Sequence, residues 1–437
     1  MISKLMKIFF YKSINKIISL INNFYRLVKN IFSLKLFIQE VLIKKKNIFE
    51  VGNVAIGHFP LSIFFSKKIF GTNIGFFYRD FLQHNANLPD SNDNIKHSNV
   101  YLKKKTEEVF NFDQNYLGVF EIMKALKVLT FGLYNYRIIP DHMYIQKDLN
   151  YSKTFDGKTN LFKFNNDEDA EGEKFLKKHN MTKDNFICFI VRTSEYNETY
   201  DITMTNGEKS YKSFFNVDQN AYFLSLNYLA NKGHKIIRMG KGFSNPFPFK
   251  HKNFIDYAIS SDRNDFLDIW LSANCKFFFG TNNGILHLPA VFNKPILGTN
   301  AFPVGSIGSY LPKSVHLPRI VKKNDHYLTL EKQVELDIIR RVNADYYHSI
   351  DVEILENTPE DILDAVKDME NKLEKGFYSS DLNIKFWKNL EKVWTKEKTL
   401  KFTHNKIAFN DCHTIDDIRT SIPDFYLKKY KDIFIDR

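Results

Sequence analysis

The chain has 437 residues, which is long for one hydrophobic core and predicts two globular domains with additional segments. Its three widely spaced cysteines exclude a disulfide scaffold and a cysteine-based zinc site. Of the net charge of +12, residues 1–50 carry +8 (ten Lys and Arg against two Glu), which leaves only +4 for the rest. The body of the protein is therefore not a strongly basic nucleic-acid binder, and we expect no nucleic-acid partner.

Residues 1–48 are predicted to form a basic amphipathic helical segment. No glycine or proline occurs before Gly52, and apolar side chains recur at helical spacing from Ile14 to Phe32. The longest uncharged stretch, residues 17–25, has nine residues and is too short to span a bilayer. The apolar face therefore either lies on a membrane surface or packs on the protein's own core or on a partner chain.

Residues 49–170 are predicted to form an N-terminal, acceptor-side α/β domain. Within it, residues 54–59 are predicted as a strand that ends in a Gly-His turn, residues 73–77 as a second strand, and residues 107–129 as a helix. The domain boundary is placed in the polar and charged stretch 150–174.

Residues 171–345 show a regular pattern that predicts a Rossmann-like domain. Buried strands alternate with helices through short connections, which indicates right-handed βαβ units and a parallel sheet. The predicted strands are 186–191, 234–239, 254–259, 275–279 and 295–298, and the predicted helices are 218–231 closed by Gly233, 262–273 capped by Asp262, and 284–292.

The remaining residues, 346–437, are predicted as a mostly helical tail. Thr358 is expected to cap a helix there that has Pro359 at its first position. No internal repeat is evident in the chain.

The sequence lacks the familiar cofactor and metal motifs. The Gly-Lys-Gly at 240–242 is not GxGxxG, and neither a Walker A sequence nor HExxH occurs. The Asp-Glu-Asp at 167–169 has D-x-D spacing, but it lies in the charged stretch, where a solvated run of charges is the ordinary interpretation. We expect neither a cofactor nor a metal.

Polar residues follow four of the predicted parallel strands, at the edge of the sheet where ligands bind. These candidate ligand-binding residues are Arg192, Arg238, Gly240, Thr281, Asn282, Asn283, Gly284 and Asn300. The 281–284 turn would offer free backbone N–H groups at a helix start, and an arginine can pair with a phosphate through two hydrogen bonds. The alternative is that the two arginines only pair with acids such as Asp262, Asp265 or Asp268.

Two histidines carry different expectations. His287 lies in an apolar run, 285–288, where such a side chain is usually only packed. His58 follows Gly57 at the end of a predicted strand in the other domain, where a general base could face a bound ligand. His58 is therefore the candidate catalytic residue.

As a set, these motifs resemble bacterial glycosyltransferase-like proteins of surface-carbohydrate synthesis. The resemblance is carried by IVRTSEY (190–196), YLANKGHKIIRMG (228–240), DFLDIWLSANCKFFFGTNNG (265–284), FNKPILGTNAFP (292–303), NTPEDILDAV (357–366) and GHFP (57–60). The C-terminal part is similar, more loosely, to heptosyltransferases and bacterial fucosyltransferases, in which the turn matching 281–284 lies near the donor diphosphate. This chain departs from the family at Phe215, because the family often has Arg there.

The resemblance implies the GT-B architecture, in which two Rossmann-like domains face each other. It also implies an enzyme, a metal-independent glycosyltransferase that moves a sugar from a nucleotide-sugar donor to a surface-glycan or lipid-linked acceptor. The expected location is cytoplasmic, peripheral at the inner face of the cell membrane through residues 1–48. Two other functions stay open, namely a sugar-nucleotide epimerase or hydrolase of the same fold and a non-catalytic membrane-associated assembly protein.

Overall fold

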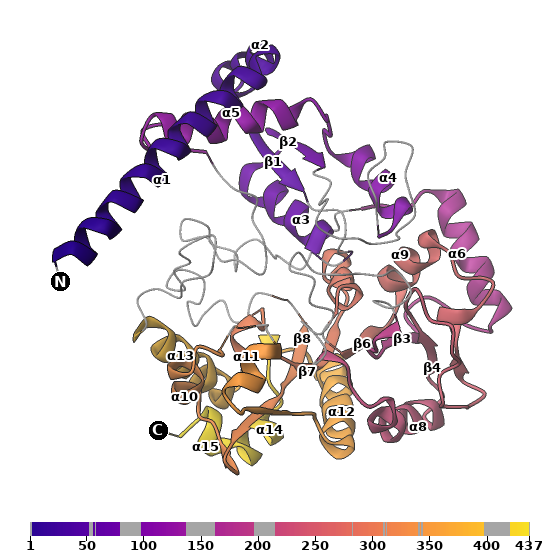
Figure 1. Ribbon diagram of the computed structural model, residues 1–437. Coiled ribbons are helices and arrows are strands. Elements are labelled where there is room, and N and C mark those ends of the chain that lie inside the picture. The colour runs from indigo at the N-terminus through magenta and orange to yellow at the C-terminus, as the bar shows by residue number, and fades with distance from the viewer. Residues whose placement is uncertain are drawn as a thin grey trace.

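The computed structural model describes residues 2–51, 56, 58–78, 98–136, 162–195, 215–281, 283–308, 311, 313–339, 341, 344–396 and 420–436. These residues form a mixed α/β protein in which a seven-stranded sheet is the largest feature and a two-stranded sheet lies above it in the view of Figure 1. The first helix reaches away from both sheets (Figure 1).

The N-terminal segment is helical, as predicted. Helix α1 (Ile2–Lys29) is followed by η1 (Ile31–Ser33), α2 (Leu34–Phe37) and the π-helical η2 (Ile38–Ile43). Helix α1 packs against α5 (Tyr116–Leu129).

The two-stranded sheet pairs β1 (Asn47–Val51) with β2 (Ile74–Tyr78) in parallel, and α3 (His58–Phe70) connects them. The strand predicted over residues 54–59 is therefore wrong at residues 58–59, which belong to a helix, whereas residues 54, 55 and 57 lie outside the described residues. Pro60 suits the first turn of that helix, where its missing N–H costs nothing. In the described part of this region the sheet has two strands, so a complete second Rossmann-like domain stays a prediction.

The single helix predicted over residues 107–129 is two helices, α4 (Val100–Val109) and α5. Between them, Phe112 forms a parallel bridge with Phe76 of β2, and its ring stacks on that of Tyr78 with centroids 4.6 Å apart. This tertiary contact breaks the helical run, and local periodicity does not reveal it.

The second half of the polar stretch 150–174 is a helix rather than a linker. Helix α6 (Asn166–Lys178) begins with a capping box, in which Asn165 Oδ1 accepts a hydrogen bond from the Glu168 N–H at 2.9 Å. The acids at 167–169 form the first turn, where carboxylates suit the positive end of the helix dipole. Glu168 also forms an ion pair with Lys105 at 2.8 Å.

The seven-stranded sheet has the order β12-β8-β7-β6-β3-β4-β5, and all its pairings are parallel, as predicted. Its strands are β3 (Phe186–Ile190), β4 (Lys235–Arg238), β5 (Phe254–Ile255), β6 (Phe277–Thr281), β7 (Ile296–Ala301), β8 (Ser314–Pro318) and β12 (Thr420–Ser421). Most of their side chains are fully buried, which is the pattern of a sheet covered on both faces.

The connections of this sheet are η4 (Gln219–Tyr222) with α8 (Phe223–Asn231), η5 (Tyr257–Ile259) with α9 (Asp265–Asn274), and η6 (Ile285–Phe292). Gly233 has a φ of +91°, as expected of a residue that closes a helix. The cap of α9 is Asn264, which accepts from the Leu267 N–H at 2.8 Å, and not Asp262 as predicted. The predicted strand 254–259 shortens to β5 and a 3₁₀ turn, and the helix predicted over 284–292 is the 3₁₀ helix η6, which contains Pro289.

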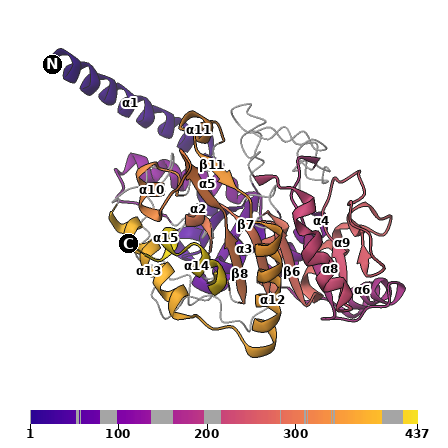
Figure 2. The ribbon, with the colours of Figure 1, turned by 90° about the horizontal axis from the view of Figure 1, so that it is seen from below.

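The rest of the chain surrounds one end of the sheet (Figure 2). It contains η7 (Val304–Ser306), an antiparallel sheet of β10 (His326–Tyr327), β9 (Ile320–Lys323) and β11 (Glu353–Leu355), and the helices α10 (Leu330–Glu335), α11 (Ala344–Ser349), α12 (Pro359–Lys375), α13 (Asp381–Lys396), α14 (Asp424–Lys429) and α15 (Lys431–Phe434). Thr358 caps α12 with Pro359 at its first position, as predicted. Helix α12 packs on β7 and β8, and β12 pairs with β8, so the tail is part of the main sheet.

Candidate functional site

The strand order reverses between β3 and β6. From β3 the chain continues to β4 and β5 on one side, and then returns to build β6, β7 and β8 on the other. In open parallel sheets, ligands bind beyond the carboxyl ends of the strands at such a switch point. The residues that follow β3 and those that end β6 are therefore the first place to look for a site.

The two strands approach each other unusually closely at that point. Gly280, next to last in β6, pairs with Ile190 at the end of β3 and has a φ of +153°. A Cβ atom on Gly280 would lie 1.9 Å from the carbonyl oxygen of Ile190. Glycine is the residue that fits here, and its absent side chain lets the ends of the two strands meet.

Thr281 then joins the two strand ends. Its Oγ1 accepts a hydrogen bond from the Arg192 N–H at 2.8 Å and another from Asn283 Nδ2 at 3.3 Å. The structure thus brings Arg192 and the 281–284 turn together, as the sequence predicted. Because Thr281 is buried and its hydroxyl oxygen is used by these neighbours, it positions the turn rather than presenting itself to a ligand.

The turn leads directly into η6. Asn283 Oδ1 accepts from the Leu286 N–H at 3.1 Å and so caps that helix. Gly284 has ordinary right-handed helical angles, with a φ of −56°. Asn282, another predicted member of the site, lies outside the described residues. The first N–H groups of a helix have no partner within it, which leaves the start of η6 suited to an anion.

Arg192 supplies a positive charge beside the turn. Its guanidinium lies over the ring of Phe215, 5.3 Å from the centroid, and forms no ion pair with any residue that the structure describes. Burial lowers the pKa of Arg192 to about 10, so the group still carries its charge at neutral pH. A largely buried cation without a counter-ion is costly, and an anionic ligand at this edge would compensate it.

Arg238 does not share this arrangement. It is almost fully buried, its Nη1 forms an ion pair with Asp256 at 3.1 Å, and it donates to the Asn245 carbonyl oxygen at 3.1 Å. Its guanidinium also lies 4.2 Å from the centroid of the Phe243 ring. The interpretation as an arginine paired with an acid therefore applies to Arg238, although the acid is not one of those expected, and its role in ligand binding stays a prediction.

Gly240 also has a structural explanation. Its φ is +135°, and a Cβ atom there would lie 2.3 Å from the ring of Phe243. Its carbonyl oxygen accepts from Arg263 Nε at 3.0 Å. The glycine is required by this turn after β4, and these contacts do not assign it to a ligand.

Asn300 also has structural partners. It is buried in β7 with a φ of +52°, a conformation that asparagine tolerates. Its Oδ1 accepts from the Asn357 N–H at 2.8 Å, its own N–H donates to Asn357 Oδ1, and its Nδ2 donates to the Tyr222 hydroxyl at 3.1 Å. The side chain ties β7 to the start of α12, and its role in donor binding stays a prediction.

We expect Asn300→Ala to lower the free energy of unfolding by about 2 kcal/mol, because it leaves the buried Asn357 N–H without its acceptor and removes one of the two hydrogen bonds of the Tyr222 hydroxyl. Urea unfolding measures this loss, and nucleotide titration of the folded variant measures binding. An affinity change much larger than the stability change would contradict the structural role.

The two histidines stand differently. His58 begins α3, which packs against η6, but its side chain lies outside what the structure describes, so its catalytic role stays a prediction. His287 lies partly buried in η6 between the fully buried Leu286 and Leu288. Among the described residues, no group of three or more His, Cys, Asp or Glu side chains could hold a metal ion.

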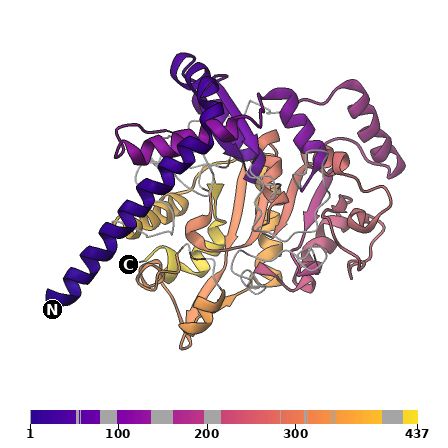
Figure 3. The same cartoon turned by 45° about the horizontal axis from the view of Figure 1, so that its top comes forward.

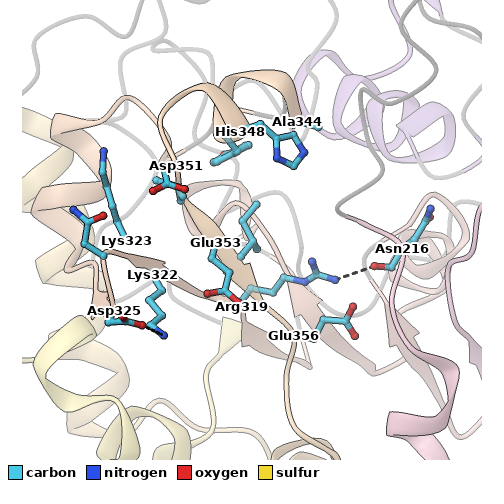
Figure 4. Close-up of a pocket in the computed structure, with 14 residues that line it drawn as sticks. Asn216, Arg319, Lys322, Lys323, Asp325, Ala344, His348, Asp351, Glu353 and Glu356 are labelled. Atoms are coloured by element: carbon cyan, nitrogen blue, oxygen red, sulfur yellow. Dashed lines mark hydrogen bonds and ion pairs between the residues drawn. The ribbon is translucent and has the colours of Figure 1, made fainter.

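A pocket of about 550 Å³ opens near the carboxyl end of β8 (Figure 4). Arg319 follows β8 as Arg192 follows β3, is almost fully buried, and donates to the Asn216 carbonyl oxygen at 3.4 Å. Glu356 lies near it and accepts from the Asp218 N–H at 3.0 Å. Sequence reasoning missed Arg319 because the predicted strands ended at residue 298. The available signal was the short run Val-His-Leu at 315–317, followed by Pro-Arg.

No family model and no curated protein matches the sequence, whereas solved structures do match. The ADP-heptose LPS heptosyltransferase II of E. coli is similar over 75% of this chain and 99% of its own, with 10% identity and a TM-score of 0.40. A family 9 glycosyltransferase from Veillonella parvula covers 75% of this chain and 98% of its own, also with 10% identity and a TM-score of 0.40.

The iron-containing dodecameric glycosyltransferase TibC of enterotoxigenic E. coli is similar over 76% of each chain, with 12% identity and a TM-score of 0.31. These solved structures are glycosyltransferases and include a heptosyltransferase, the class to which the sequence motifs are similar. At such identities and TM-scores, the function has to be argued from the site of this chain itself.

Proposed function

We propose that this protein is a glycosyltransferase whose nucleotide-sugar donor places its diphosphate between Arg192 and the 281–284 turn. The observation that carries the proposal is the guanidinium of Arg192, which is charged, largely buried and without an ion pair among the described residues. It lies at the switch point of the parallel sheet, where its N–H is held by Thr281.

This arrangement suits departure of a nucleoside diphosphate. In the transfer, an acceptor hydroxyl oxygen forms a bond to the anomeric carbon of the sugar while the bond from that carbon to the diphosphate oxygen breaks. Negative charge grows on the diphosphate, where the Arg192 guanidinium and the N–H groups at the start of η6 would stabilise it. The proton of the acceptor hydroxyl passes to a base.

The N-terminal part of the chain would supply the base and bind the acceptor. Helix α3 packs against η6, so the N-terminal part reaches the element that begins at the turn. His58, the first residue of α3, remains our candidate base, and a surface-glycan or lipid-linked saccharide remains our candidate acceptor. We further propose metal-independent transfer at the inner face of the cell membrane.

Arg192→Met tests the donor site. We expect it to weaken binding of the cognate nucleoside diphosphate by about tenfold to a hundredfold, because it removes a charged hydrogen-bond donor. The apo protein should keep its melting temperature, since the variant removes a desolvated charge that has no ion pair with a described residue. Thermal shift across nucleoside diphosphates and nucleotide-sugars identifies the ligand, and calorimetry then compares the affinities.

Arg341→Met is the matched control, because Arg341 is partly exposed and pairs with Asp337 within its own turn. It should leave nucleotide affinity unchanged. The proposal fails if no nucleotide raises the melting temperature, or if Arg192→Met binds as tightly as the unmodified chain. Turnover of the donor to an epimer or to free sugar without any acceptor would instead assign the site to an epimerase or hydrolase.

A further inference from the structure

Helix α1 and the η1 turn that follows it expose a row of large apolar side chains to solvent. We call this row the α1 stripe, and it consists of Ile14, Ile17, Ile18, Ile21, Phe24, Tyr25, Val28, Ile31 and Phe32. Ile21 is 62% exposed, Phe24 61% and Phe32 96%. Soluble monomers rarely expose a contiguous apolar patch of this kind without a partner for it.

The side of α1 that faces the protein is the opposite one. Asn23 is buried, Leu27 packs into the core cluster around α5, and Arg26 forms an ion pair with Glu121 at 2.7 Å. At about 100° per residue, Ile21 and Val28 lie roughly 160° and 140° around the helix from the buried Asn23. The core formed by the described residues therefore does not cover the stripe, and of the possibilities left open by the sequence a membrane surface and a partner chain remain.

The shape of the molecule leaves the stripe accessible. Helix α1 projects from the rest of the protein in the views of Figures 1, 2 and 3, with its N-terminal end farthest from the sheets. Further exposed apolar side chains continue through α2 and η2, namely Leu34, Ile38, Leu42 and Ile43. The surface is thus a long apolar ridge rather than a closed pocket.

The charge around this ridge is positive. Lys16, Lys29, Lys35 and Lys45 are exposed, and residues 1–50 carry +8. No described helix is apolar over enough of its length to cross a bilayer. A second copy of the chain would bring two such positive segments together, whereas an anionic lipid surface offers both apolar depth and the opposite charge.

We propose that the α1 stripe docks the protein on the surface of an anionic lipid bilayer, with α1 lying in the headgroup plane. The apolar side chains enter the boundary of the acyl region, and the flanking lysines contact anionic headgroups. This docking concerns a surface distinct from the Arg192 site and does not depend on the proposed sugar transfer.

The experiment is sedimentation of the full chain with vesicles of phosphatidylcholine, with and without phosphatidylglycerol. Binding is expected to vesicles that contain phosphatidylglycerol and to weaken as salt is raised. Ile21→Glu with Phe24→Glu should reduce vesicle binding by about tenfold or more, because two apolar side chains are lost from the buried face. Both side chains are exposed, so folding should be retained, as far-ultraviolet circular dichroism would show.

Asn15→Glu with Asn22→Glu is the matched control, since it adds the same two negative charges at exposed positions off the stripe. It should weaken binding far less than the stripe variant. Equal losses in both variants would reduce the effect to charge and overturn docking through the stripe. The proposal is also overturned if the unmodified chain does not bind vesicles. If that chain is then a dimer in sedimentation velocity and the stripe variant is a monomer, the stripe binds a second copy instead.

Nucleotide affinity separates this proposal from the transferase. The stripe variant should bind nucleoside diphosphate as the unmodified chain does, and Arg192→Met should bind vesicles normally. Each proposal can therefore fail without the other.

Discussion

Gly280→Ala is expected to cost about 4 kcal/mol or more of the free energy of unfolding, a large share of the stability of an ordinary domain. The added Cβ atom would lie 1.9 Å from the carbonyl oxygen of Ile190 and 2.9 Å from its carbonyl carbon. Both atoms belong to the backbone of β3, which pairs with β6 at this point, so relief requires moving one strand away from the other. The backbone angle of Gly280 adds strain for any side chain.

Urea unfolding followed by tryptophan fluorescence measures this loss. Gly71→Ala is the matched control, because Gly71 also has a positive φ, +68°, but no atom lies within 4 Å of its added Cβ. Its expected cost is only about 1 kcal/mol, from the backbone conformation alone. Similar losses in the two variants would show that the close approach of β3 and β6 contributes nothing.

Acidification is expected to remove about 3 kcal/mol of stability through His316. This residue lies in β8, it is 2% exposed, and neither of its ring nitrogens has a hydrogen-bond partner among the described residues. Burial lowers the pKa of His316 to about 4. The folded protein therefore keeps the imidazole neutral at a pH where the unfolded chain would already protonate it.

The direction of the pH dependence follows from the difference in the pKa of His316 between the folded and the unfolded chain. The pKa of His316 is lowered on folding from 6.5, so the unfolded chain binds the proton first, and the stability present above pH 6.5 is lost between about pH 6.5 and pH 4. A shift of this size corresponds to about 3 kcal/mol. Asp268 acts in the opposite sense, because burial raises its pKa to about 6. The comparison is therefore made between the unmodified chain and His316→Leu.

Urea unfolding at several pH values between 7.5 and 4.5 gives the two stability profiles. As the pH falls, the free energy of unfolding of the unmodified chain should decrease relative to that of His316→Leu. Parallel profiles would show that the imidazole is hydrated or hydrogen-bonded in the folded protein, and that burial does not lower the pKa of His316.

The sequence was informative wherever a segment's structure depends on its own residues. The strands β3, β4, β6 and β7 are continuous runs of buried side chains and were all placed correctly. The strand predicted over residues 54–59 overlaps the first two residues of helix α3, because short apolar runs in a buried helix and in a buried strand look alike. Strand β12 has two residues and exists only through its pairing with β8, so no local pattern could predict it.

The site divides in the same way. Proximity of Arg192 to Thr281 follows from the order of parallel strands, and the hydrogen bond between them confirms it. Whether an arginine is free to bind a ligand depends on residues that are separated from it in the sequence but contact it in the fold. Arg238 is held by Asp256 and Asn300 by Asn357, and neither pairing could be chosen from sequence among the many acids and amides available.

The pairing of β12 with β8 also has a consequence for how the protein is made. Ser314 is paired with Thr420, so β8 leaves the ribosome 106 residues before the strand that covers its edge. At ordinary rates of synthesis, that interval lasts about 5 to 20 seconds. During this interval the edge of β8 is unpaired and could pair with a strand of another chain. A chain truncated before residue 420 would keep this edge unpaired. Nascent chains of this protein are thus expected to depend on chaperones late in translation.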